Sequence, residues 1–180
     1  PTAFLTQVLL NHVVSGAVKS TGLTTGYIKT LAKTAASGNN TMNMYVDLTS
    51  GVKLNGVSSV STADIMASNG VIHIVNSVIG LPSILAHAEA NPNFKTLVAV
   101  VKNPAQSGIL SALSGPGPLT VFAPTDGGFT KLNSDLIGLG IEGGISGVSQ
   151  ATISNVLSYH VVNGNVLASS LSAGNVPTLL

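Results

Sequence analysis

The spacing of hydrophobic residues changes character between the two halves of this 180-residue chain. Residues 3–11 carry apolar side chains at helical spacing and lead into a short apolar strand at 12–14. Apolar and polar positions then alternate as they do in half-buried strands, and Asn55-Gly56 is typical of a tight hairpin turn. The strands predicted from this alternation are 42–48, 52–54, 57–60, 65–66 and 71–75.

After Pro82 the apolar positions recur mainly at helical spacing. Ser83, Asn93, Ser149 and either Thr125 or Asp126 stand where helix N-caps are expected. The helices predicted in this part are 84–90, 94–103, 107–113, 126–136 and 151–158, and the strands are 119–122 and a segment from His160. The whole chain therefore reads as an α+β fold, with a mixed α/β arrangement as the alternative.

Two segments of the chain are near copies of each other. Residues 8–18 read VLLNHVVSGAV and residues 156–166 read VLSYHVVNGNV, so that His12 aligns with His160 at a spacing of 148 residues. A period of that length corresponds to a whole domain and is too long for a solenoid repeat. We therefore expect the chain to begin inside one copy of a domain and to stop inside the next.

Three segments resemble the signature motifs of the fasciclin domain family. They read TVFAPTD at 120–126, YHVV at 159–162 and DIMASNGVIHIV at 64–75. The resemblance implies a fasciclin-like β-sandwich or wedge with a packed helical layer. The motif that comes second in the family lies first here, so the resemblance implies two partial domains.

The resemblance assigns residues 1–82 to the C-terminal part of one fasciclin-like domain and residues 83–180 to the N-terminal part of the next. The two parts would form one circularly permuted domain if they packed together. In that arrangement residues 1–31 and 149–179 would compete for one position. The duplication therefore favours completion of each part from outside, by flanking sequence or by a neighbouring copy.

Composition excludes several classes of function. Only 7% of the residues are charged, the net charge is +1 and there is no Arg, which argues against a nucleic-acid-binding surface. The absence of Cys excludes disulfides and thiolate metal sites. No run of 18 apolar residues is present, so we expect no membrane-spanning segment.

Six residues are candidates for contacts with a partner. His12 and His160 could contact a ligand or partner, or else tie a helix–strand junction to nearby backbone. Asn11 stands where the other copy has Tyr159. Asp64-Ile65 resembles the Asp-Ile pair reported for integrin-binding animal fasciclin proteins; the structural alternative is an Asp that accepts backbone N–H groups beside a core Ile.

Catalytic motifs are absent from the sequence. Residues 138–143 fit the pattern GxGxxG, but a helix is predicted before this segment and no acidic residue follows Glu142, so we interpret it as a loop. His73 is expected to pack or hydrogen-bond within its strand. No carboxylate pair, nucleophile motif or metal-ligand cluster stands out, and we expect neither enzyme activity nor a cofactor.

The resemblance implies a non-catalytic adhesion or surface-structure protein that is secreted or displayed on a cell surface. Its expected partners are proteins or cell-surface molecules and adjacent fasciclin copies, including self-association into a filament. The alternative is a binder of a lipophilic small molecule, a carotenoid or a lipid, although aromatic residues make up only 4% of the chain. Residues 39–41 also form a glycosylation sequon.

Overall fold

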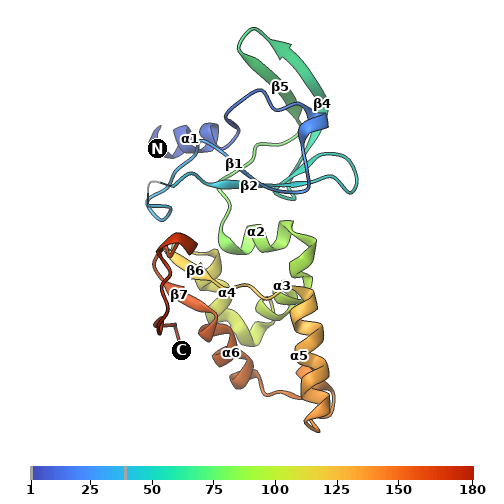
Figure 1. The fold of residues 1–180 in the computed structure, drawn as a ribbon, viewed down its shortest axis with the longest axis vertical. Helices are drawn as coiled ribbons and strands as arrows, with labels where there is room; N and C mark the ends of the chain where they lie inside the picture. Colours follow the sequence, from blue (N-terminus) through green and yellow to red (C-terminus); the bar gives the residue numbers. More distant parts are fainter. Residues whose placement is uncertain (1, 39) are drawn as a thin grey trace. The chain divides into compact units, whose positions relative to one another are not determined.

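The computed structural model describes residues 2–38 and 40–180, so Asn39 of the predicted glycosylation sequon lies outside the described residues. The chain divides into two compact units, Pro1–Pro82 (unit 1) and Ser83–Leu180 (unit 2). Unit 1 contains most of the strands and unit 2 most of the helices (Figure 1). The predicted α+β class is confirmed. Within the described residues no helix is long and apolar enough to cross a lipid bilayer.

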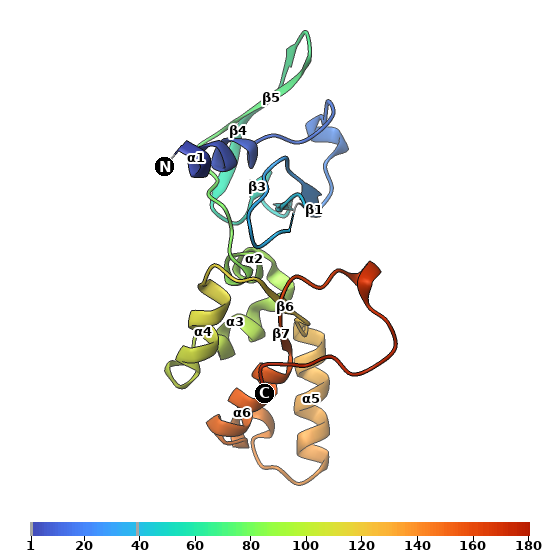
Figure 2. The ribbon, with the colours of Figure 1, turned by 90° about the vertical axis from the view of Figure 1, so that its left-hand side faces the viewer.

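Unit 1 consists of one helix and a five-stranded antiparallel sheet in the order β1-β2-β3-β4-β5. The hairpin β4–β5 projects from the body of the unit (Figures 1 and 2). The elements are α1 (Thr2–Leu10), the 3-10 turn η1 (Ser20–Gly22), β1 (Gly26–Lys29), β2 (Asn43–Asp47), β3 (Lys53–Leu54), β4 (Ser58–Ala67) and β5 (Gly70–Val75).

The turn between β3 and β4 follows the sequence prediction, while β4 departs from it. Asn55 and Gly56 both adopt positive φ, at 49° and 69°, as a primed hairpin turn requires. The two short strands predicted at 57–60 and 65–66 are one strand, β4, whose pairing with β5 is irregular between Val60 and Ile65. Asp64 has φ 61° at this irregularity. The bulge interrupts the apolar–polar alternation, which explains why the sequence suggested two strands.

The core of unit 1 lies against one face of the sheet. Met44, Val46, Leu54 and Ile79 are buried there, and partly buried side chains surround them. β1, which carries one of those side chains, Ile28, was missed by the sequence analysis. It is only four residues long and pairs with β2 along its whole length.

Unit 2 consists of helices packed around a two-stranded antiparallel sheet, β6–β7. The elements are α2 (Ile84–Ala90), η2 (Pro92–Phe94), α3 (Lys95–Val101), η3 (Pro104–Gln106), α4 (Ser107–Ser114), β6 (Leu119–Val121), α5 (Asp126–Gly138), η4 (Gly144–Gly147), α6 (Gln150–Tyr159), β7 (Val161–Asn163) and η5 (Ala168–Ser170). Figure 2 shows the segment after β7 leaving the helices and returning to them. On its return the Leu179 N–H donates to the Val161 carbonyl at 2.9 Å.

Of the four predicted helix caps, two are confirmed by side-chain hydrogen bonds, Thr125 stands at the N-cap of α5 without one, and one is wrong. The Ser83 hydroxyl accepts the Ala86 N–H and the Ser149 hydroxyl accepts the Thr152 N–H. Asn93 does not cap α3, because Pro92 starts a separate 3-10 turn before that helix. Instead, the Asp126 carboxylate, at the start of α5, accepts the Thr96 N–H in the first turn of α3 at 2.7 Å. This bond lowers the pKa of Asp126 below 3.8.

The core of unit 2 is shared between its helices and β7. The helices bury apolar side chains toward one another, and two residues of the α6–β7 segment, Leu157 and Val161, complete the cluster. The other buried members are Leu85, Leu97, Val101, Leu113 and Phe129. At the apolar burial coefficient of about 25 cal/mol per Å², each such Leu or Val contributes roughly 1.5–3 kcal/mol.

Candidate functional site

The two copies of the histidine junction share their local geometry. The Nδ1 of His12 lies 2.8 Å from the Val8 carbonyl, and the Nδ1 of His160 lies 2.7 Å from the Val156 carbonyl. Because a carbonyl oxygen only accepts, Nδ1 carries the hydrogen in both rings. The glycine four residues later has φ 91° in the first copy and 94° in the second. The duplication found in the sequence therefore recurs as the same local structure.

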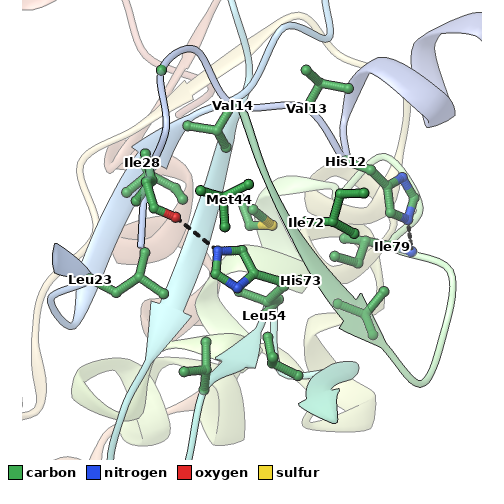
Figure 3. Close-up of a pocket in the computed structure, with 16 residues that line it drawn as sticks. His12, Val13, Val14, Leu23, Ile28, Met44, Leu54, Ile72, His73 and Ile79 are labelled. Atoms are coloured by element: carbon green, nitrogen blue, oxygen red, sulfur yellow. Dashed lines mark hydrogen bonds between the residues drawn. The ribbon is translucent and has the colours of Figure 1, made fainter. Parts of the chain in front are cut away.

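The far nitrogen of the ring differs between the copies. In unit 1 the Ile79 N–H donates to the Nε2 of His12 at 2.9 Å, so this ring bridges α1 and the segment after β5 (Figure 3). Among the described residues the Nε2 of His160 has no hydrogen-bond partner. This nitrogen is therefore an acceptor, and His160 lines a cavity of unit 2.

Asn11 and Tyr159 occupy equivalent positions in very different surroundings. Asn11 is 0% exposed; its Nδ2 donates to the Gly80 carbonyl at 2.8 Å and its Oδ1 accepts the Thr30 hydroxyl at 3.1 Å. Tyr159 is 63% exposed. A small amide fits between α1 and the rest of unit 1, and an exposed phenol ring has no such limit. The difference between Asn11 and Tyr159 in the sequence therefore reflects the burial of the first copy and the exposure of the second at this position.

The neighbouring apolar residues show the same contrast. Val8 is 8% exposed in unit 1, while its equivalent Val156 is 46% exposed in unit 2. On the other face of the same segment the order is reversed, because Leu9 is 60% exposed and its equivalent Leu157 only 7%. Each unit therefore buries the face of the helix–strand segment that the other unit leaves open.

Asp64 of the predicted Asp-Ile pair holds unit 1 together. Its carboxylate accepts the N–H and the hydroxyl of Ser20, and these two bonds lower the pKa of Asp64 below 3.8. Its own N–H donates to the Nδ1 of His73, whose Nε2 donates to the Val18 carbonyl at 2.8 Å. Asp64 and His73 thereby fix residues 15–22 against the hairpin β4–β5.

Ile65 is not a core residue, contrary to the structural interpretation of the Asp-Ile pair. It lies opposite Ile72 in the β4–β5 ladder, and both side chains are exposed. Ile74 is exposed two residues further along the same face of β5. The three isoleucines form an apolar surface on one face of the projecting hairpin, here named the hairpin surface. The alternation of side chains along β5 could have indicated that Ile72 and Ile74 share one face. In β4 the bulge interrupts this alternation, so the sequence did not indicate the face of Ile65.

Each unit also contains an apolar cavity. The cavity of unit 1 has a volume of about 320 Å³ and lies between Val13, Val14 and the sheet residues Ile28 and Met44 (Figure 3). The cavity of unit 2, of about 400 Å³, lies between α5 and α6. Its lining is almost wholly apolar and includes Phe129, Leu136 and Val156, with His160 at its edge.

Titratable side chains are dispersed over the described residues. Nowhere among them do three His, Asp or Glu side chains gather closely enough to hold a metal ion. The GxGxxG segment begins with the last residue of α5, and the rest of it is a loop, as predicted. The Asn133 Oδ1 accepts the Ile145 N–H at 3.0 Å in the turn η4 that follows this loop. The geometry therefore offers surfaces and apolar cavities for binding.

Comparison with known proteins gives two matched segments that correspond closely to the two units. Residues 1–82 and 92–180 match the model of the fasciclin domain. Two Synechocystis proteins are similar: protein sll1483 is 35% identical over 97 residues, 54% of this chain and 50% of that protein, and the uncharacterised protein sll1735 is 34% identical over 91 residues, 51% and 62%. The chain thus spans about half to two thirds of the length of these relatives.

Two animal proteins are also similar. The transforming growth factor-beta-induced protein ig-h3 of Sus scrofa is 29% identical over 127 residues, 67% of this chain and 17% of that protein. A solved FAS1 domain pair of the insect cell adhesion molecule fasciclin I covers 96% of this chain and 63% of its own, with a TM-score of 0.53 at 18% identity, a likeness of fold. Because the family model covers nearly the whole sequence, the chain belongs to the fasciclin domain family.

Proposed function

We propose that this chain is a non-catalytic adhesion protein of the cell exterior whose hairpin surface contacts a protein partner. The observation that carries the proposal is the exposure of Ile65, Ile72 and Ile74 on one face of β4–β5. Exposed apolar side chains grouped on a rigid element are typical of protein-binding sites. With only 7% charged residues, contacts of this chain depend on apolar area and multiplicity more than on charge.

Asp64 supports this surface by positioning it. Its bonds to Ser20 and His73 hold the middle of the projecting hairpin, so the three isoleucines are presented on a fixed strand pair. Asp64 is a positioning residue in this proposal, and Ile65 is a contact residue. Tyr159, exposed on unit 2, is a further contact residue in this proposal, and tyrosine is enriched at interfaces.

We further propose that unit 1 is the C-terminal part of one fasciclin domain and unit 2 the N-terminal part of the next. The support is that the two copies of the duplicated segment bury opposite faces. In a complete domain one such segment would be covered on one face as in unit 1 and on the other face as in unit 2.

Attachment of suspended fibroblasts to a surface coated with the chain tests the adhesion proposal. We expect attachment above an albumin-coated surface, and a several-fold loss with the double variant Ile72→Lys and Ile74→Lys. The matched control is Val57→Lys, a residue of similar exposure in the turn between β3 and β4. If the native chain supports no more attachment than albumin, the adhesion proposal is contradicted. If the double variant and the control Val57→Lys support equal attachment, the hairpin surface is not the contact surface.

The second candidate function is binding of a lipophilic molecule in the cavity of unit 2. The nearly complete apolar lining of this 400 Å³ cavity favours it, with the Nε2 of His160 available to accept from one hydroxyl group. Organic extraction of the purified chain followed by mass spectrometry and a visible absorption spectrum tests it. A bound lipid or pigment that is lost in Val156→Trp, which narrows the cavity, is the expected result. Recovery of no such molecule would contradict this candidate.

A further inference from the structure

We propose that the exposed face of residues 2–14, formed by Leu5, Leu9 and Val13, is the docking surface for the helical layer of a second copy of this chain. The helical layer is defined here as residues 83–121, from α2 to β6. The inference rests on the proposed assignment of the two units as complementary parts of fasciclin domains. It names the partner, its register and the segment that must move.

The helical layer already binds a segment with the same pattern. In unit 2 the residues equivalent to Leu5, Leu9 and Val13 are Ile153, Leu157 and Val161, at the constant spacing of 148. Leu157 and Val161 are buried in the core of unit 2, and Ile153 packs against it. Val161 is 2% exposed, whereas Val13 is 44% exposed. The layer is therefore shaped for the side chains that unit 1 leaves open.

The backbone gives the same register. β6 pairs with β7, with Val121 opposite Val161 and Thr120 opposite Val162. The equivalent of Val162 in unit 1 is Val14, whose only strand contact among the described residues is an isolated bridge to Thr30. The Leu31 N–H to Val13 carbonyl bond matches that from Leu179 to Val161, so the edge that faces β6 in unit 2 is the edge left open in unit 1.

Docking requires an exchange of segments. The α6–β7 segment of the second copy must leave its helical layer, and residues 2–14 of the first copy take its place with the same apolar contacts. The incoming segment brings the rest of unit 1 with it, in which Val8 and Asn11 are already buried and Asn11 and His12 are bonded to residues 79–80. The exchanged assembly therefore covers both faces of the segment, which neither unit does alone.

The exchange is head to tail. Each copy offers one open segment in unit 1 and one helical layer in unit 2, and these two surfaces differ. Heterologous contacts that do not close into a ring generate an open chain of copies. The inference thus predicts self-association that increases with concentration.

A disulfide between copies tests the proposal, because the native chain has no Cys. The full chain with Val13→Cys and Val121→Cys is oxidised and run on a non-reducing gel. We expect products at multiples of 18.0 kDa. The control, Val161→Cys with Val121→Cys, joins residues that face each other within β6–β7 and should cross-link at the mass of one chain.

Two results would overturn the proposal. One is a Val13–Val121 variant that stays uncross-linked while the control cross-links, which shows a folded unit 2 that accepts no second segment. The other is a Val13–Val121 cross-link at the mass of one chain, which assigns the docked layer to the same copy. Neither result touches the hairpin surface, so the attachment assay still reports on the proposed function.

Light scattering of the unmodified chain gives an independent reading. Leu9→Glu should weaken self-association at least tenfold without unfolding unit 1, since Leu9 is exposed there. The matched control Val57→Glu, exposed on the same unit, should associate like the native chain. A native chain that stays at 18.0 kDa at all concentrations, or equal association of the two variants, would contradict the proposal.

Discussion

The two copies of the helix–strand segment share most of their sequence and their local geometry, yet they bury opposite faces. In unit 1 Val8 and Asn11 are buried, and in unit 2 Leu157 and Val161 are buried in the helical core. The burial of a residue in this segment is therefore decided by the layer that packs against it. A helix that is apolar around most of its circumference, such as TAFLTQVLL, is typical of one covered on several sides.

The largest effect expected from this comparison is on stability at the equivalent leucines. Leu157→Ala removes a core side chain and should lower the free energy of unfolding of unit 2 by about 2–5 kcal/mol. Leu9→Ala acts on an exposed side chain and should change unit 1 by less than about 0.5 kcal/mol. NMR-detected urea titration reads the two units separately. Equal losses in both units would break the comparison.

A smaller but still clear difference is expected at position 11 and its equivalent. Asn11→Ala removes the hydrogen bonds that Asn11 makes to the Gly80 carbonyl and the Thr30 hydroxyl inside unit 1. It should lower the free energy of unfolding of unit 1 by about 1–3 kcal/mol. Tyr159→Ala removes an exposed ring from a helix and should stay within about 0.5 kcal/mol. The same urea titration measures both. A Tyr159→Ala loss as large as that of Asn11→Ala would show that something covers unit 2 at this face.

The two histidines sharpen the comparison further. His12→Ala removes the local bond to the Val8 carbonyl and the bond from the Ile79 N–H, and we expect a loss of about 1–2 kcal/mol in unit 1. His160→Ala removes only the local bond to Val156, and we expect about 0.5 kcal/mol in unit 2. Hydrogen exchange at the Ile79 amide should also accelerate in His12→Ala alone. An unchanged Ile79 amide would contradict the bridging role of the ring.

The smallest expected effect is the response to acid. The folded-state pKa of Asp64 in unit 1 is lowered by bonds from the hydroxyl and the N–H of Ser20, and that of Asp126 in unit 2 is lowered by the bond from the Thr96 N–H. Stability from these groups is present above the unfolded pKa and is lost as the pH falls through the folded value. Between about pH 6 and pH 3 the urea midpoints should fall. Asp64→Asn should flatten this fall in unit 1 only, and Asp126→Asn in unit 2 only.

Much of the fold followed from local signals in the sequence. Asn55-Gly56, Ser83 and Ser149 act within a few residues, so the turn and the two caps were predicted correctly. The start of α3 was not, because its cap is Asp126 from a distant helix. β1 was missed because a four-residue strand depends on its pairing with β2.

The candidate site was predicted only where local sequence signals decide its structure. Repetition drew attention to His12 and His160, and the structure gives them the same bond to the preceding turn. The sequence could not show that Asn11 is buried and Tyr159 exposed, because that contrast depends on which layer covers each copy. Nor could it show the hairpin surface, since the bulge at Asp64 shifts Ile65 to the open face.

Thiol accessibility tests the reciprocal burial most directly, because the chain has no native Cys. Four single variants, Val8→Cys, Leu9→Cys, Val156→Cys and Leu157→Cys, are labelled in dilute solution, where copies stay apart. Fast labelling at Leu9 and Val156 with slow labelling at Val8 and Leu157 is the predicted result. Similar rates at Leu9 and Leu157, or slow labelling at Leu9 and Val156 alike, would contradict the claim that each unit covers one face and leaves the other open.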